Sequence, residues 1–214
     1  MAESFFRSAV LVAVLIAAGL PCAAFEETNV VAASDWSAPV DHQFHALRGR
    51  LLILEGTPAD NRLTMFVELQ NAQPGAGTSL KLFFDVMDLK CELTDARGKP
   101  GPEPLNRPWG GRGPFPPGWV ILPYASTLRL FVNPGTREPL TLCPGGEPWR
   151  SWVIPAADTN TYYLSATLTV ATPTNASLVA TPHAEGNIHE YTAWQGTLVF
   201  PKFKLPGAPP GPAK

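Results

Sequence analysis

Apolar and polar residues alternate with a period of two along most of this chain. A period of two places successive side chains on opposite faces of an extended strand, so each run predicts a strand with one face in a core. Alternating or short apolar runs of this kind occupy residues 50–55, 63–71, 80–86, 89–93, 119–124, 126–132, 140–143, 152–154, 162–170 and 193–200. The pattern, in which neighbouring runs can merge, predicts about eight or nine strands.

Turn-forming residues separate these runs at short intervals. Pro74-Gly75 and Asp95 to Gly98 break the chain between strands, and Asn133-Pro134-Gly135 predicts another turn. Gly196 predicts a bulge or a close backbone approach in the last strand, which residues 202–206 extend or cover. Residues after 24 show no convincing amphipathic helix. The strand and turn patterns together predict an all-β fold with antiparallel strands packed as a sandwich.

The stretch from Ser151 to Val170 predicts a corner between two strands. Its turn carries Asp158 four residues before Tyr162, and Leu164 follows Tyr162 by two residues. This arrangement resembles the tyrosine corner of immunoglobulin-like and fibronectin-III-like domains, in which the tyrosine hydroxyl bonds back to the preceding backbone. The resemblance implies an immunoglobulin-like β-sandwich with Asp158 and Tyr162 as its structural corner. Leu164 stands where antibody domains have their second cysteine.

The N-terminal segment has the features of a secretory signal peptide. Arg7 precedes an uncharged apolar run at 8–20, and Cys22-Ala23-Ala24 offers a cleavage site before Phe25. The run is shorter than the roughly 17 to 25 residues that a membrane span needs. An uncleaved anchor and a lipidated Cys22 are the alternatives, and Pro21 argues against lipidation. We therefore expect a signal peptide at 1–24, a sandwich domain at 25–206, a flexible Pro/Gly tail at 207–214, and a secreted, periplasmic or envelope location without a membrane span after cleavage.

Two cysteines remain after the predicted cleavage. Export to an oxidising compartment favours a disulfide between Cys91 and Cys143, and two buried thiols are the alternative. Cys91 shares its strand face with Leu89 and Leu93, which favours a core-facing sulfur over a reactive one.

Residues 99–118 hold seven of the chain's 24 prolines and predict a long loop. Its aromatic and basic side chains make it the best candidate for a contact surface, which we assign to Trp109, Arg112, Phe115 and Trp119. The alternative is that these aromatic side chains fasten the loop onto the sandwich.

Composition and motifs exclude several classes of function. Charged residues make up 16% of the chain and the net charge is −2, so a nucleic-acid partner is not expected. The sequence lacks phosphate-binding, nucleophile-elbow and metal-ligand motifs, which predicts no cofactor, no metal and no enzyme. A glycosidase using two of the grouped carboxylates Asp85, Asp88, Glu92 and Asp95 is a weaker hypothesis, because Asp85, Asp88 and Glu92 fit a solvent-facing role.

A segment of about 110 residues is similar to uncharacterised secreted proteins of planctomycete-type bacteria. The stretches that carry the resemblance are Cys91-Glu-Leu-Thr-Asp, the Pro-rich loop, Leu122-Pro-Tyr and the corner at Asp158. It implies no known activity. Two hypotheses follow: an exported, non-enzymatic domain that binds a protein, or a carbohydrate-binding module that stacks loop aromatics on a polysaccharide.

Overall fold

The computed structural model describes residues 29–42, 45–56, 61–72, 79–106, 118–143, 150–171 and 193–207. The predicted signal peptide, Cys22 and residues 208–214 of the predicted tail lie outside these ranges. The described residues form thirteen strands and a 3-10 helix, η2 (Val86–Asp88). The strands are β1 (Val30–Ala33), β2 (Val40–His42), β3 (His45–Glu55), β4 (Arg62–Asn71), β5 (Leu80–Phe84), β6 (Leu89–Asp95), β7 (Leu105–Asn106), β8 (Gly118–Leu122), β9 (Thr127–Thr136), β10 (Leu140–Leu142), β11 (Arg150–Ile154), β12 (Tyr162–Val170) and β13 (Gly196–Lys204).

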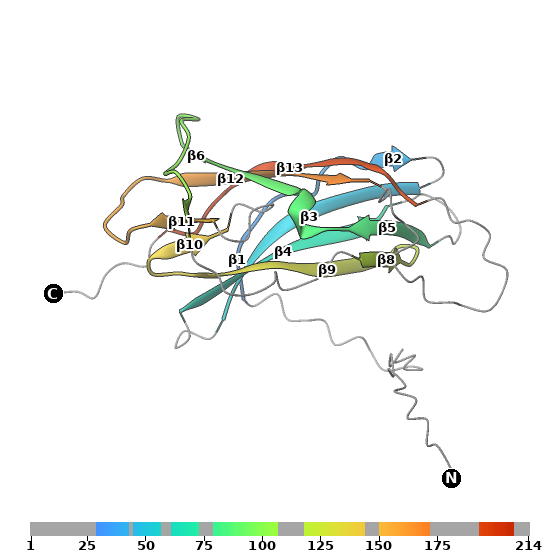
Figure 1. Cartoon of the computed structure of the whole chain (residues 1–214), viewed down its shortest axis with the longest axis horizontal. Helices are drawn as coiled ribbons and strands as arrows, with labels where there is room; N and C mark the ends of the chain where they lie inside the picture. The colour runs from blue at the N-terminus through green and yellow to red at the C-terminus, as the bar shows by residue number, and fades with distance from the viewer. Residues whose placement is uncertain are drawn as a thin grey trace, which may run out of the picture.

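All pairings between these strands are antiparallel, which confirms the all-β prediction. The largest sheet has the order β1-β3-β4-β9-β10-β11-β7, with β2 pairing to β3. A second sheet has the order β13-β12-β6, and β5 pairs with β8 as a two-stranded ribbon. Figure 1 shows β6, β12 and β13 in one layer and β4 and β9 in another, an arrangement compatible with a β-sandwich.

The two layers meet through the faces that the alternation predicts as apolar. On β4, Leu63, Met65, Val67 and Leu69 are at most 1% exposed. Leu164 and Leu168 on β12 are equally buried and join the same core. At Gly49 on β3, an added Cβ would lie 2.8 Å from the Phe200 ring of β13. The glycine therefore permits close contact between the layers.

The structure has more strands than the eight or nine predicted. The prediction missed β1, β2 and β7, which have two to four residues each and give too short a pattern to recognise. It also missed the first five residues of β3, where polar residues interrupt the apolar run. Strand β12 was predicted with its observed bounds.

The predicted turn at Asn133-Pro134-Gly135 is wrong, because β9 runs through it to Thr136. Here Thr64 of β4 faces Pro134, whereas the described pairing of β9 with β10 involves only Thr136. A proline is tolerated in a strand whose N–H side needs no ladder partner. The turn instead occupies residues 137–139 and contains a cis bond between Glu138 and Pro139.

Gly196 begins β13 with a φ of +157°. An added Cβ there would lie 3.0 Å from the Trp194 ring. The sequence predicted either a bulge or a close approach at Gly196, and the structure shows the close approach. Strand β13 continues to Lys204, as the sequence had suggested.

Candidate functional site

Of the four predicted contact residues, the structure describes Trp119. The other three, Trp109, Arg112 and Phe115, lie outside the described residues. Trp119 lies on β8 opposite Phe83 of β5, and the two rings meet edge to face with centroids 5.4 Å apart. The ammonium group of Lys81 lies 4.3 Å from the Trp119 ring centroid. These two neighbours fix the orientation of the half-buried indole.

A cleft of about 370 Å³ adjoins Trp119, between the ribbon and β9. We call it the aromatic cleft, and it is lined by Phe66, Phe84, Gly118, Trp119, Val120, Arg129, Leu130 and Phe131. Its volume lies at the low end of the range for binding pockets. Four aromatic rings supply its apolar surface, and Arg129 supplies a cation at its wall. Figure 1 shows how β8 and β9 lie next to each other here.

A row of charges crosses β3, β4 and β9 beside the aromatic cleft. Glu68 is 5% exposed and accepts hydrogen bonds from Arg50 on one side and Arg129 on the other. The strand register explains this row of charges, because Glu68 pairs with Arg50 in one neighbouring strand and with Arg129 in the other. Trp36 covers the guanidinium of Arg50 at 4.8 Å. The buried carboxylate is thus satisfied, and the row holds Arg129 in place at the cleft wall.

The corner contains a hydrogen bond from the Tyr162 hydroxyl to Asp158 Oδ2, with a length of 2.9 Å. The acceptor is therefore a side-chain carboxylate and not the backbone acceptor implied by the resemblance to immunoglobulin-like domains. The backbone N–H of Asn160 also donates to Asp158, at 2.8 Å. The hydrogen bond from this N–H lowers the pKa of Asp158 and is the largest effect. Burial raises this pKa by a smaller amount, and the hydrogen bond from the Tyr162 hydroxyl lowers it further. Burial, followed by the Asp158 carboxylate, raises the pKa of Tyr162.

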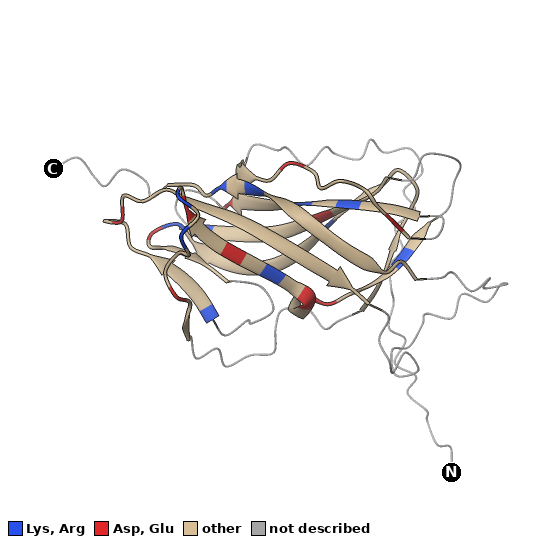
Figure 2. Cartoon of the chain, turned by 90° about the horizontal axis from the view of Figure 1, so that it is seen from above, with Lys and Arg blue, Asp and Glu red and all other residues tan. Residues whose placement is uncertain are grey.

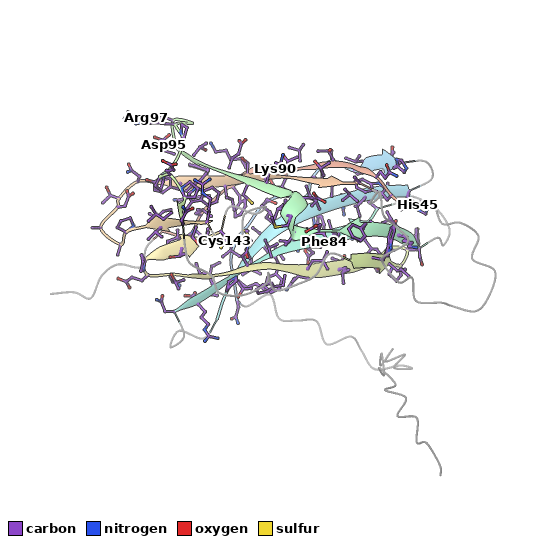
Figure 3. All side chains as sticks on the ribbon, viewed as in Figure 1. His45, Phe84, Lys90, Asp95, Arg97 and Cys143 are labelled. Atoms are coloured by element: carbon purple, nitrogen blue, oxygen red, sulfur yellow. The ribbon has the colours of Figure 1, made fainter. Side chains whose placement is uncertain are left out.

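The predicted disulfide between Cys91 and Cys143 is absent from the structure, in which both residues are thiols. Cys91 lies on β6 in one layer, whereas Cys143 follows β10 in the other layer and contacts the Ser151 hydroxyl at 3.6 Å. Figure 3 shows Lys90, the neighbour of Cys91, in the upper layer and Cys143 in the lower one. Burial, and then the nearby Cys143, raises the pKa of Cys91 to about 12. Such a thiol is unreactive at neutral pH.

A second cavity, of about 840 Å³, opens along β6. We call it the edge cavity. Its walls are η2 and β6, the segment 100–104, and Arg150 and Trp152 of β11. Arg150 forms a 3.7 Å ion pair with the exposed Glu103 at this wall. This cavity was not predictable from the sequence, since its walls come from three separate stretches of chain.

Of the carboxylates considered for glycoside hydrolysis, Asp85 and Asp88 belong to the η2 turn, whereas Glu92 is exposed on β6. Asp85 accepts a hydrogen bond from the Met87 N–H and so caps this helix. Burial raises the pKa of Asp88, the Asp85 charge raises it further, and Lys90 lowers it. Local capping accounts for Asp85 without a catalytic role.

The described ranges contain neither a group of metal-binding side chains nor a membrane-spanning helix. Among these residues, three or more His, Cys, Asp or Glu do not gather into a metal-binding group. The same part of the chain contains no helix of the length and apolarity that a membrane crossing requires.

Comparison of the chain with protein-family models, with curated proteins and with solved structures found no significant match. The immunoglobulin or fibronectin-III type of the sandwich and the similarity to planctomycete proteins therefore depend on the sequence pattern alone.

Proposed function

We propose that this protein is an exported, non-enzymatic β-sandwich domain of immunoglobulin-like type that binds another protein in the cell envelope or outside the cell. The aromatic cleft is the observation that carries this proposal. Export follows from the N-terminal sequence, and the sandwich type follows from the corner pattern. The cleft takes an apolar side chain of the partner, while Arg129 contacts a polar or acidic group beside it.

The composition of the cleft supports a protein partner. Partly exposed tryptophan, phenylalanine and arginine side chains dominate the energetics of protein interfaces. Phe66 and Phe131 already meet edge to face at 5.9 Å, so their rings are ordered before a partner arrives. Pre-ordered rings reduce the entropy that binding costs.

A pull-down from envelope extract, with the purified protein as bait, tests the proposal. Trp119→Ala removes one wall of the cleft, and we expect at least a tenfold loss of the retained partner, as for a central interface residue. Ile121→Ala is the matched control, because Ile121 lies on the same strand, is 62% exposed and does not line the cleft. Equal retention by both variants, with unchanged thermal unfolding, would contradict the proposal.

A carbohydrate-binding module is the second candidate, because half-buried Trp119 and Arg129 also suit a polysaccharide. Sugar-binding modules present open aromatic faces, but the Trp119 ring is approached by Lys81 and Phe83. This crowding favours a protein partner. Running insoluble polysaccharides in parallel with the extract separates the two candidates: retention on polysaccharide that Trp119→Ala abolishes would establish the module instead.

A further inference from the structure

Strand β6 forms an edge of the three-stranded sheet. It pairs with β12 from Tyr162 opposite Asp95 to Leu168 opposite Leu89, without a shift in register. Its odd-numbered residues direct their backbone groups away from β12. Leu93 C=O accepts from Gly101 N–H, and Leu89 N–H bonds to Val86 C=O. The alternation of a β-ladder therefore points the N–H and C=O of Cys91 outward as well.

Four outward backbone groups have no partner in the described part of the chain: Leu89 C=O, Cys91 N–H, Cys91 C=O and Leu93 N–H. They border the edge cavity, which Leu93 and Cys91 help to line. An unpaired strand edge is a template for one more strand. Natural edges are often blunted by a bulge, a proline, an inward charge or outward charges. Residues 89–93 contain no bulge, proline or inward charge, and their charged side chains, Lys90 and Glu92, are exposed.

The side chains around Cys91 define what a further strand would carry. Cys91 shares a face with buried Leu89 and Leu93, so the residue opposite Cys91 would also point inward, toward the edge cavity and Trp152. Lys90 and Glu92 are exposed on the other face. Figure 2, which views the molecule from above, shows acidic and basic segments following one another along one strand. Complementary charges on the new strand would face them.

We propose that the β6 edge binds an extended segment of a partner protein as an added antiparallel strand, with a basic, an apolar and an acidic residue in that order. The apolar residue lies opposite Cys91 and exchanges two hydrogen bonds with it. The basic residue faces Glu92 and the acidic residue faces Lys90. The residue after the acidic one donates its N–H to Leu89 C=O. Main-chain bonds supply affinity in this mode, and side-chain pockets supply specificity.

A second copy of this chain carries the same order, Lys90-Cys91-Glu92, but fits the edge poorly. Antiparallel pairing of two copies centred on Cys91 would place Leu89 of the second copy beside Leu93. Gly101 already occupies that position, with its N–H 2.8 Å from Leu93 C=O. A peptide that begins opposite Glu92 avoids this collision. The partner segment therefore starts, or bends away, at its basic residue.

Titration with the synthetic peptide Lys-Val-Glu-Val-Thr tests the proposal, with amide NMR shifts and hydrogen exchange of the purified protein as readouts. We expect shifts confined to the region of residues 89–92, and at least tenfold slower exchange of the Cys91 amide at saturation. The charge-reversed peptide Glu-Val-Lys-Val-Thr should bind about fivefold more weakly, since it replaces two favourable cross-strand charge pairs with two like-charge pairs. The double substitution Lys90→Glu, Glu92→Lys should invert that preference.

Cys91→Pro removes the outward N–H without removing a bond to β12, and we expect peptide binding to fall below detection. Cys91→Ala keeps the N–H and should bind normally. If the proline variant fails to fold, the charge inversion still decides. Any of three results would overturn the proposal. These are unchanged exchange of the Cys91 amide at saturating peptide, equal affinity for both peptides, and a dimer in sedimentation that pairs through β6. Trp119→Ala should leave this binding unchanged, which separates it from the aromatic cleft.

Discussion

The hydrogen bond between Tyr162 and Asp158 gives a direct measure of what the corner contributes to stability. Tyr162→Phe removes the hydroxyl and keeps the ring, which packs against the core. A hydrogen bond to a charged group contributes about 1.5–3 kcal/mol. This pair is only half-buried, and Asp158 keeps its bond from the Asn160 N–H, so the lower end applies. We expect a loss of about 1.5 kcal/mol, equivalent to about 3–6 °C in Tm for a chain of this size.

Urea unfolding followed by circular dichroism measures this loss, and the neighbouring residue supplies the control. Tyr163 is half-buried on the same strand, and its ring lies 4.9 Å from the Lys202 ammonium. The described contacts of Tyr163 include no hydrogen bond from its hydroxyl. Tyr163→Phe should therefore change the free energy of unfolding by less than about 0.5 kcal/mol.

A double-mutant cycle with Asp158→Ala isolates the interaction between the two side chains. The coupling energy should be about 1 kcal/mol or more, because the residues are in direct contact. Equal effects of Tyr162→Phe and Tyr163→Phe, or a coupling energy near zero, would refute the assignment of this bond as the source of corner stability.

Three further predictions follow from other contacts. The pKa of Asp158 is lowered in the folded protein, so the stability that this carboxylate contributes is present above its ordinary pKa and is lost as pH falls through the folded pKa. Unfolding measured from pH 6 to pH 2 should show this loss in the wild type and less of it in Asp158→Ala. Gly49→Ala should cost about 1–3 kcal/mol in urea unfolding, since its Cβ would lie 2.8 Å from the Phe200 ring, and Gly207→Ala, with open space around it, should cost far less. Cys91, with a pKa of about 12, should react with iodoacetamide at pH 8 at least about a hundredfold more slowly in the folded protein than in urea, as measured by peptide mass mapping. Protection of Cys91 and Cys143 that survives urea and disappears with reductant would instead establish the disulfide.

The strands that the sequence predicts well are those in which alternation and burial agree. Residues 162–170 and 63–69 alternate without interruption, and both have one buried face in the structure. Alternation says nothing about which strand pairs with which, so the sheet order β1-β3-β4-β9-β10-β11-β7 was not predictable. The turn at Asn133-Pro134-Gly135 was predicted wrongly because residue type outweighed a pairing with β4 that only the fold supplies.

The candidate sites were less predictable than the fold. Trp119 could be named from the sequence, but the aromatic cleft also needs Phe66 and Phe131, which lie on other strands and read as ordinary strand residues. The cysteines could be named too, but their separation between two layers depends on the sheet topology. Residue type identified individual side chains, and the tertiary fold decides which of them meet.

Strand β12 connects the corner with the open edge. Tyr162 at its first position is held by Asp158 and lies opposite Asp95, the last residue of β6. From there, the unbroken register fixes Cys91 opposite Ala166 and so directs the Cys91 backbone groups away from β12. A shift of one residue would turn those groups toward β12 and bring the charged residues of β6 to the core face. The corner thus helps to set the register on which binding at the β6 edge depends, and Tyr162→Phe should raise the exchange rate of amides along β6 as well as lower global stability.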